Sequence, residues 1–171
     1  MLGTTSKQRR KEKSIEKTAR LNLKRETRKK GAYLHIRLMV YSDGGARGNP
    51  GPAAMAFLIL TEKGQVVKKQ SRCLGVRTNN QAEYEALIAA LESAVAIGAE
   101  ELICHLDSEV VAKHLTGEYK VKNAALKQLW NRAQELKKRF KKVSFVNVPR
   151  TDRYIQEADR LVNEALDEAS K

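Results

Sequence analysis

The chain has 171 residues, of which 42% are hydrophobic and 31% are charged, and its formal net charge is +13. That length allows one domain with a hydrophobic core plus a short appendage, and the composition excludes a fibrous or wholly disordered protein. The strong positive charge indicates a polyanionic partner, with nucleic acid ahead of a membrane surface. No apolar run is long enough to cross a bilayer and no signal peptide is evident, so we expect a cytoplasmic protein that binds no membrane. We also expect a monomer.

Residues 1–31 carry most of the charge, because seven Lys, five Arg and three Glu give this segment a net charge of +9. The segment offers few large apolar side chains for burial, such as Ile15, Leu21 and Leu23, and cannot offset its own ordering entropy. We therefore expect a basic tail that is either disordered or a solvated helix, with a boundary near Gly31 and one folded domain over residues 32–171. The three glutamates disfavour a mitochondrial transit peptide.

After the tail, the pattern predicts strands at 34–41, 53–60 and 66–74, which form an antiparallel meander. A helix from Thr78 to a stop at Gly98 follows. The chain then predicts a strand at 101–106, helices at 110–115 and 124–140, a strand at 143–148 and a helix at 155–169. The later strands are reached through helices and should be parallel, so we expect an α/β fold with a mixed five-stranded sheet flanked by helices. Cys73 and Cys104, set among apolar residues, are predicted to be buried thiols in a reducing compartment.

Two aspartates stand at the ends of predicted strands. Asp43 directly follows the first strand and Asp107 directly follows the fourth. If those strands are parallel neighbours, both carboxylates emerge at the same edge of the sheet, where open α/β sheets bind ligands. Either aspartate alone is explained as well by a turn or a helix cap, although Ser108 is itself a candidate cap for the next helix.

Two further acids stand within the apolar stripes of predicted helices. Glu83 precedes Ala86 and Leu87 by three and four residues, and Asp159 falls within the apolar stripe that includes Val162. A first-turn acid also favours the helix dipole. Two inward-facing acids together with two at strand ends, however, indicate a common positive charge, because a buried carboxylate needs a partner.

A divalent cation would supply that charge. All-oxygen ligands favour Mg²⁺ or Mn²⁺ over Zn²⁺, and His35, His105 and His114 show no zinc spacing. Two such ions about 4 Å apart could activate a water and stabilise the departing oxygen in phosphodiester hydrolysis. The residues alone therefore predict a metal-dependent nuclease.

Four motifs in order carry a family resemblance: DGGARGNPGP at 43–52, TNNQAE at 78–83, LDS at 106–108 and EADRLVN at 157–163. Together they resemble type 1 ribonuclease H over roughly residues 34–169, in the archaeal-like branch without a basic protrusion. The resemblance implies an endonuclease that hydrolyses the RNA strand of RNA–DNA hybrids, leaves 5′-phosphate and 3′-hydroxyl ends, and uses two Mg²⁺ ions that Mn²⁺ can replace. Whether double-stranded RNA is also a substrate stays open.

The resemblance also implies roles for matching positions. It implies that Asp43, Glu83, Asp107 and Asp159 are catalytic and bind the metal. Loop backbone and asparagine side chains would lie in the minor groove, where 2′-hydroxyls identify RNA, and Thr78 with Arg77 would hold a phosphate of the DNA strand. The implied substrate-binding set is Gly44, Ala46, Asn49, Arg77, Thr78, Asn79, Asn80, Ser108 and Arg150.

Two departures from the family pattern leave alternatives open. The loop before the last helix lacks the mobile His of many members, and Arg150 stands about where it would fall. The basic handle of some bacterial members is also missing, so we expect the tail or a lysine-rich cluster to hold the substrate electrostatically, unless both are only solvated charge. That cluster comprises Lys137, Lys138, Arg139, Lys141 and Lys142. The competing hypotheses are a catalytically inactive nucleic-acid-binding module on the same fold, and a resolvase- or transposase-like nuclease, which the asparagine-rich motif disfavours.

Overall fold

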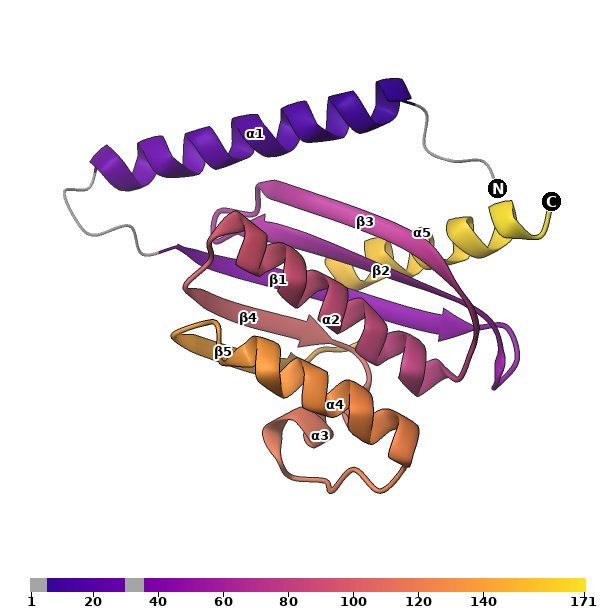
Figure 1. The fold of residues 1–171 in the computed structure, drawn as a ribbon. Helices are drawn as coiled ribbons and strands as arrows, with labels where there is room; N and C mark the ends of the chain where they lie inside the picture. The colour runs from indigo at the N-terminus through magenta and orange to yellow at the C-terminus, as the bar shows by residue number, and fades with distance from the viewer. Residues whose placement is uncertain (1–5, 30–35) are drawn as a thin grey trace.

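A computed structural model describes residues 6–29 and 36–171, the side chains of 26–29 excepted. It contains one five-stranded sheet with helices on both faces and a further helix along one side (Figure 1). Outside the described residues lie the predicted boundary at Gly31 and the first two residues of the predicted first strand, Leu34 and His35.

The observed elements follow the predicted order β-β-β-α-β-α-α-β-α after a first helix, so that order is confirmed. Their bounds are α1 (Ser6–Lys29), β1 (Arg37–Ala46), β2 (Gly51–Thr61), β3 (Val66–Arg77), α2 (Asn79–Ile97), β4 (Glu101–Leu106), α3 (Glu109–Thr116), α4 (Ala124–Lys137), β5 (Lys142–Asn147) and α5 (Arg153–Ala169).

The sheet has the order β3-β2-β1-β4-β5. β1 pairs antiparallel with β2 and parallel with β4, and β4 pairs parallel with β5, as predicted. The prediction that Asp43 follows β1 is wrong, because β1 and β2 stay paired through the glycines to Ala46, and Asp43 lies opposite Ala56. The turn between β1 and β2 is therefore left to residues 47–50, shorter than the gap of 42–52 between the two predicted strands.

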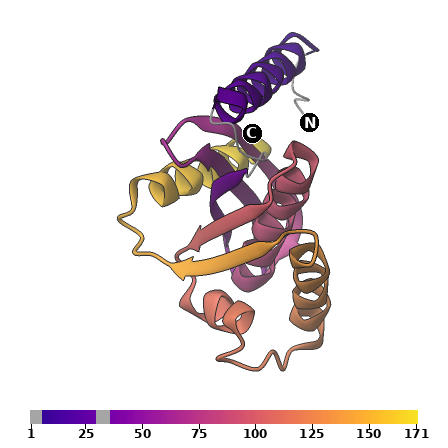
Figure 2. The same ribbon diagram turned by 90° about the vertical axis from the view of Figure 1, so that its left-hand side faces the viewer.

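Two hydrophobic layers hold the helices on the sheet. On one face α2, α3 and α4 pack over a core that includes Tyr84, Phe57 and Leu91, all fully buried. On the other face α5 packs over a smaller core that includes Leu58 and Ile155. Figure 2 shows α5 on the opposite side of the sheet from α2 and α4. Cys104 is buried as predicted, but Cys73 is exposed, because β3 is an edge strand.

Helix α1 takes the helical alternative predicted for the tail and lies against β3 (Figure 1). Ala19 is buried there at 7% exposure, and a Glu16 oxygen lies 3.1 Å from Lys68 Nζ. Ile15 and Leu21, two of the apolar residues expected to be available for burial, remain 53% and 50% exposed. Over the described ranges 6–29 and 36–171, none of the helices combines the length and hydropathy that crossing a membrane requires.

Two polar contacts of His114 connect α2, α3 and α4 on their face of the sheet. The buried His114 of α3 has its Nδ1 3.0 Å from the Tyr84 hydroxyl of α2, and its backbone oxygen accepts a hydrogen bond from the Trp130 indole N–H of α4. Burial lowers the pKa of His114 below its ordinary 6.5, so the neutral imidazole is favoured at this position.

Candidate metal centre

The parallel pairing of β1 and β4 brings two aspartates together. Tyr41 of β1 pairs with His105 of β4, and Asp43 and Asp107 each stand two residues further along their strands. Asp43 is 7% exposed, and Asp107 is partly buried. The predicted meeting of these carboxylates at one edge of the sheet is therefore found.

Gly44 allows α2 to approach β1 closely enough to deliver a third acid. A Cβ at this position would lie 2.2 Å from the backbone carbon of Ala82 and 2.5 Å from the backbone nitrogen of Glu83. With hydrogen there instead, Glu83 is 8% exposed and faces Asp43. A carboxylate oxygen from each of Asp43, Glu83 and Asp107 lies within 4.8 Å of the other two.

Burial and mutual repulsion oppose ionisation of this cluster. Burial and the charges of Asp107 and Asp159 raise the pKa of Asp43 from 3.8 to about 7. Burial and the charge of Asp43 raise the pKa of Glu83 well above its ordinary value. Without a cation, burial and the neighbouring charges therefore favour the protonated form of Glu83, whose carboxyl is hydrogen-bonded to Asp43.

The cluster fits a divalent cation. Among the described residues, no group donates to or accepts from Oε2 of Glu83, although this atom is fully buried. A buried carboxylate oxygen without a partner is costly unless a ligand satisfies it. Three acidic oxygen donors around one point match a hard cation such as Mg²⁺, Mn²⁺ or Ca²⁺ rather than zinc, which prefers nitrogen and sulfur.

Asp159, the fourth predicted acid, is exposed on α5. The expectation that it faces inward like Glu83 is therefore wrong. Ile155, Ala158 and Val162 are buried, and Asp159 stands at the border of that stripe. Its charge nevertheless raises the pKa of Asp43 and of Asp107, so it lies near the open side of the cluster.

Two residues beside the cluster act on Asp107. The side chain of Arg150 is exposed, with its Nε 3.4 Å from Asp107 Oδ2, and its charge lowers the pKa of Asp107 against the opposing effect of burial. Asn147, at the end of β5, donates from Nδ2 to the backbone oxygens of Leu106 and Asp107, at 3.2 and 3.1 Å. Sequence reasoning did not single out Asn147, because a strand-end asparagine carries no distinctive spacing.

The β1–β2 turn is hydrogen-bonded to the first residue of α2. The Ala46 N–H donates to Oδ1 of Asn79 at 2.9 Å, and the Asn79 N–H donates to Oδ1 of Asn49 at 3.0 Å. Thr78 caps α2, since its hydroxyl accepts from the Gln81 N–H. These contacts fix the turn beside Glu83 and leave the Asn79 side chain largely exposed.

Two of the three remaining predicted substrate residues, Arg77 and Ser108, have structural partners. Arg77 is ion-paired with Glu85, with Nε 2.9 Å from the carboxylate. Ser108 caps α3, as its hydroxyl accepts from Val111 N–H at 3.3 Å. Asn80 is half-buried in the first turn of α2.

A family model described as reverse transcriptase-like matches residues 41–165. Ribonuclease HI of Halobacterium salinarum is 43% identical over 133 residues, which cover 78% of this chain and 66% of that protein. The chain belongs to the ribonuclease H family. It also resembles a bifunctional protein of Mycobacterium tuberculosis, at 38% identity over 80% of this chain but only 37% of that protein. The matched segment thus spans two thirds or less of these relatives.

Solved ribonuclease H structures have the same fold. The crystal structure of ribonuclease H1 from Halobacterium salinarum is 42% identical, covers 77% of this chain and 98% of its own, and has a TM-score of 0.74. A compost-derived ribonuclease H1, LC11, in complex with an RNA/DNA hybrid is 40% identical over 78% of this chain and 99% of its own, with a TM-score of 0.73. The family implies dependence on a divalent metal, and the acidic cluster that could bind it is present.

Proposed function

We propose that this protein hydrolyses the RNA strand of RNA–DNA hybrids, leaving 5′-phosphate and 3′-hydroxyl ends. The observation that carries the proposal is the convergence of Asp43, Glu83 and Asp107 on one point, with a buried oxygen of Glu83 that has no partner. The relatedness to LC11 ribonuclease H1, whose crystal structure contains an RNA/DNA hybrid, supports the choice of substrate.

The four acids would hold two Mg²⁺ ions, or two Mn²⁺ ions in their place. The ions would polarise the scissile phosphate and lower the pKa of a bound water. Asp43 and Glu83, being buried and rigidly held by the contact between β1 and α2, would fix the positions of the ligand oxygens. Asp159, exposed at the border of the cluster, would complete the set from the solvent side.

The turn joined to α2 would contact the minor groove of the hybrid. The Asn79 side chain is exposed and already held by the hydrogen bond that its Oδ1 accepts from the Ala46 N–H, so it would meet the duplex with a reduced loss of side-chain entropy. The contact between β1 and the start of α2 includes the backbone at Gly44 and Ala46, with Asn49 and Asn80 beside it. Recognition there would depend on 2′-hydroxyl groups, which distinguish the RNA strand from DNA.

The remaining predicted residues would bind backbone phosphates, on the DNA strand beside Thr78 and on the RNA strand beside Asp107. The Thr78 hydroxyl and the α2 N-terminus would bind one phosphate, with Arg77 leaving Glu85 to share it. Ser108 and Arg150 flank Asp107 and would contact the phosphate next to the cleaved bond. We further propose that the protein is a cytoplasmic monomer, with residues 32–171 forming the catalytic domain.

Cleavage of matched hybrid, double-stranded RNA and double-stranded DNA, each with Mg²⁺ or Mn²⁺, tests the proposal. Wild type should cut the hybrid, and Glu83→Gln and Asp43→Asn should reduce the rate by at least about 1,000-fold, since they remove ligand charge from the transition state. Glu118→Gln, a change of an exposed glutamate outside the cluster, is the matched control and should cleave like wild type.

Hybrid cleavage that survives both substitutions undiminished would overturn the mechanism. A wild-type protein that binds hybrid but never cuts it would favour the inactive binding module instead. Cleavage of double-stranded DNA in preference to the hybrid would favour a resolvase-like nuclease.

A further inference from the structure

Helix α1 separates its charges between two sides. Between residues 6 and 25 all nine Lys and Arg side chains are exposed. Glu16 instead lies toward the sheet, where it pairs with Lys68, and Glu12 precedes it by one helical turn. Ala19 and Leu23 pack on the same side, so the inward face takes the apolar and acidic residues and the outward face is basic.

Four cations form a stripe along the outward face. Arg10, Lys13, Lys17 and Arg20 follow one another at spacings of three, four and three residues, which places them on one side of the helix. Like charges at such spacings destabilise a helix by a few tenths of a kcal/mol per pair. Among the described side chains, none of these four has an ion-pair partner. Within the part of the chain that the structure describes, the stripe therefore costs helix stability without an ion pair to offset the cost.

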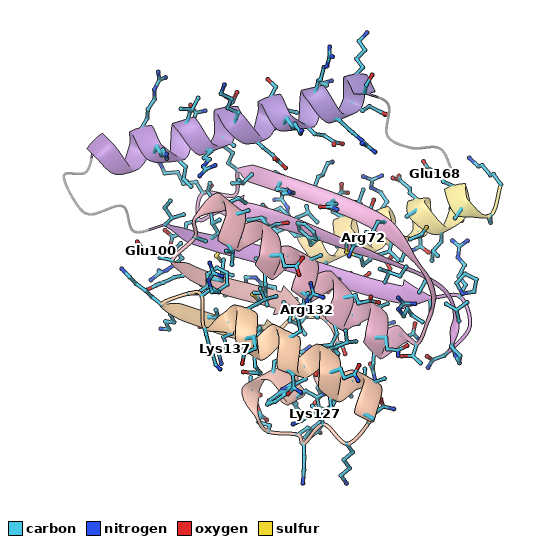
Figure 3. All side chains as sticks on the ribbon, viewed as in Figure 1. Arg72, Glu100, Lys127, Arg132, Lys137 and Glu168 are labelled. Carbon is cyan, nitrogen blue, oxygen red and sulfur yellow. The ribbon has the colours of Figure 1, made fainter. Side chains whose placement is uncertain are left out.

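The adjoining strand β3 carries two more basic side chains, one beneath α1 and one beside it. Lys68 and Arg72 are four residues apart in β3, so their side chains lie on the same face of the sheet. The contact of Lys68 with Glu16 shows that this is the face that α1 covers. Arg72, labelled in Figure 3, is exposed and continues the surface along β3 toward Arg77.

We propose that the outward stripe of α1 is a second nucleic-acid-binding surface that contacts the sugar–phosphate backbone without reading sequence. The kind of ligand rests on the proposed function. From Arg10 to Arg20 the stripe is about 15 Å long, at about 1.5 Å per helical residue, and so matches a short run of backbone phosphates. A membrane-binding helix would direct an apolar face outward, whereas Ala19 and Leu23 are used against the sheet.

The stripe lies apart from the lysine-rich cluster that the sequence offers as an alternative grip. In Figure 3 the labelled Lys137 of α4 lies near β5, at the opposite edge of the sheet from β3, along which α1 lies. In that cluster Lys138 pairs with Glu135 and Lys141 with Glu100. Since these lysines already have acidic partners, fewer of their charges are available to phosphates.

The test compares two variants that lose the same charge. Binding of a labelled 20-base-pair RNA–DNA hybrid and of a DNA duplex is measured by fluorescence anisotropy over a salt series in EDTA. R10Q/K13Q/K17Q/R20Q should weaken binding of both duplexes at least about tenfold at low salt and reduce the slope of log K against log salt by about 3, at about 0.9 per lost phosphate contact. The variant of the lysine-rich cluster, K137Q/K138Q/R139Q/K141Q, should change the same slope by less than about 1.

Glutamine preserves helix propensity, and circular dichroism checks that α1 still forms. The proposal is wrong if the α1 variant binds both duplexes like wild type, or if the cluster variant loses as much duplex affinity as the α1 variant. It is also wrong if the α1 variant loses binding only to anionic phosphatidylserine vesicles. Because binding is measured without metal, failure of hybrid cleavage would refute the proposed function and leave this result standing.

Discussion

Replacing Asp43 with Asn should stabilise the metal-free protein at pH 8. The folded protein raises the pKa of Asp43 from 3.8 to about 7. Because the folded value lies above the unfolded one, stability is lost as the pH rises from 3.8 to about 7, and the loss is complete above that range. At about 1.4 kcal/mol for each tenfold change in proton affinity, the ionised cluster is destabilised by about 4 kcal/mol. Asparagine cannot ionise, so the variant avoids this penalty.

Thermal unfolding in EDTA at pH 5 and pH 8 measures the effect. For a chain of this size, about 4 kcal/mol corresponds to a Tm difference of about 8–16 °C, with Asp43→Asn the more stable at pH 8 and the difference much smaller at pH 5. Adding Mg²⁺ at pH 8 should raise the Tm of wild type more than that of the variant. Glu118→Gln, which removes an exposed charge, should leave the Tm unchanged. Equal Tm values for wild type and Asp43→Asn at pH 8 in EDTA would refute the reasoning.

Three further substitutions test the parts around the cluster. Gly44→Ala should lower the free energy of unfolding by about 2–3 kcal/mol and slow cleavage, because its methyl would meet the Ala82 backbone; a loss under about 1 kcal/mol in urea unfolding would contradict the contact. Arg150→Ala should raise the pKa of Asp107 and move the acid limb of the pH–rate profile to higher pH, with Arg150→Lys intermediate; an unmoved limb would exclude this electrostatic effect. Asn79→Ala should cost about 1 kcal/mol of stability and raise KM for the hybrid more than it lowers kcat; an unchanged KM would separate the residue from substrate binding.

Helix and strand order could be predicted because the local signals were strong. α2 begins after Thr78 and ends before Gly98, where the chain supplies a capping hydroxyl and a left-handed glycine, respectively. The parallel pairing of β1 with β4 followed from the intervening helix, and this pairing placed Asp43 near Asp107.

Sequence patterns could not give the features that depend on long-range contacts. Gly44 and Gly45 suggest a loop, yet they continue the β1 ladder opposite Met55 and Ala54, because β2 is there to pair with them. Asp159 matches the apolar period of α5 only at its border, and the contacts of α5 with the sheet bury Ile155, Ala158 and Val162 but not Asp159.

The basic tail is a second example of a feature that depends on long-range contacts and that sequence patterns could not predict. Its composition indicated either disorder or a solvated helix, and small Ala19, rather than the larger apolar residues, is the side chain that becomes buried. The separation of acidic and basic faces in α1 is visible in the sequence only once β3 defines which side is inward.

The contact between His114 and Tyr84 has a consequence for the tolerance of the metal-free fold to acid. Since burial holds the pKa of His114 below 6.5, stability is lost as the pH falls below that value and the imidazole must take up a proton. The carboxyl cluster has the opposite pH dependence, because the fold loses stability when Asp43 ionises as the pH rises. In the chelated protein, acidification from pH 6.5 toward 3.8 should therefore gain stability at the carboxyl cluster while it loses stability at His114, so the two effects oppose each other.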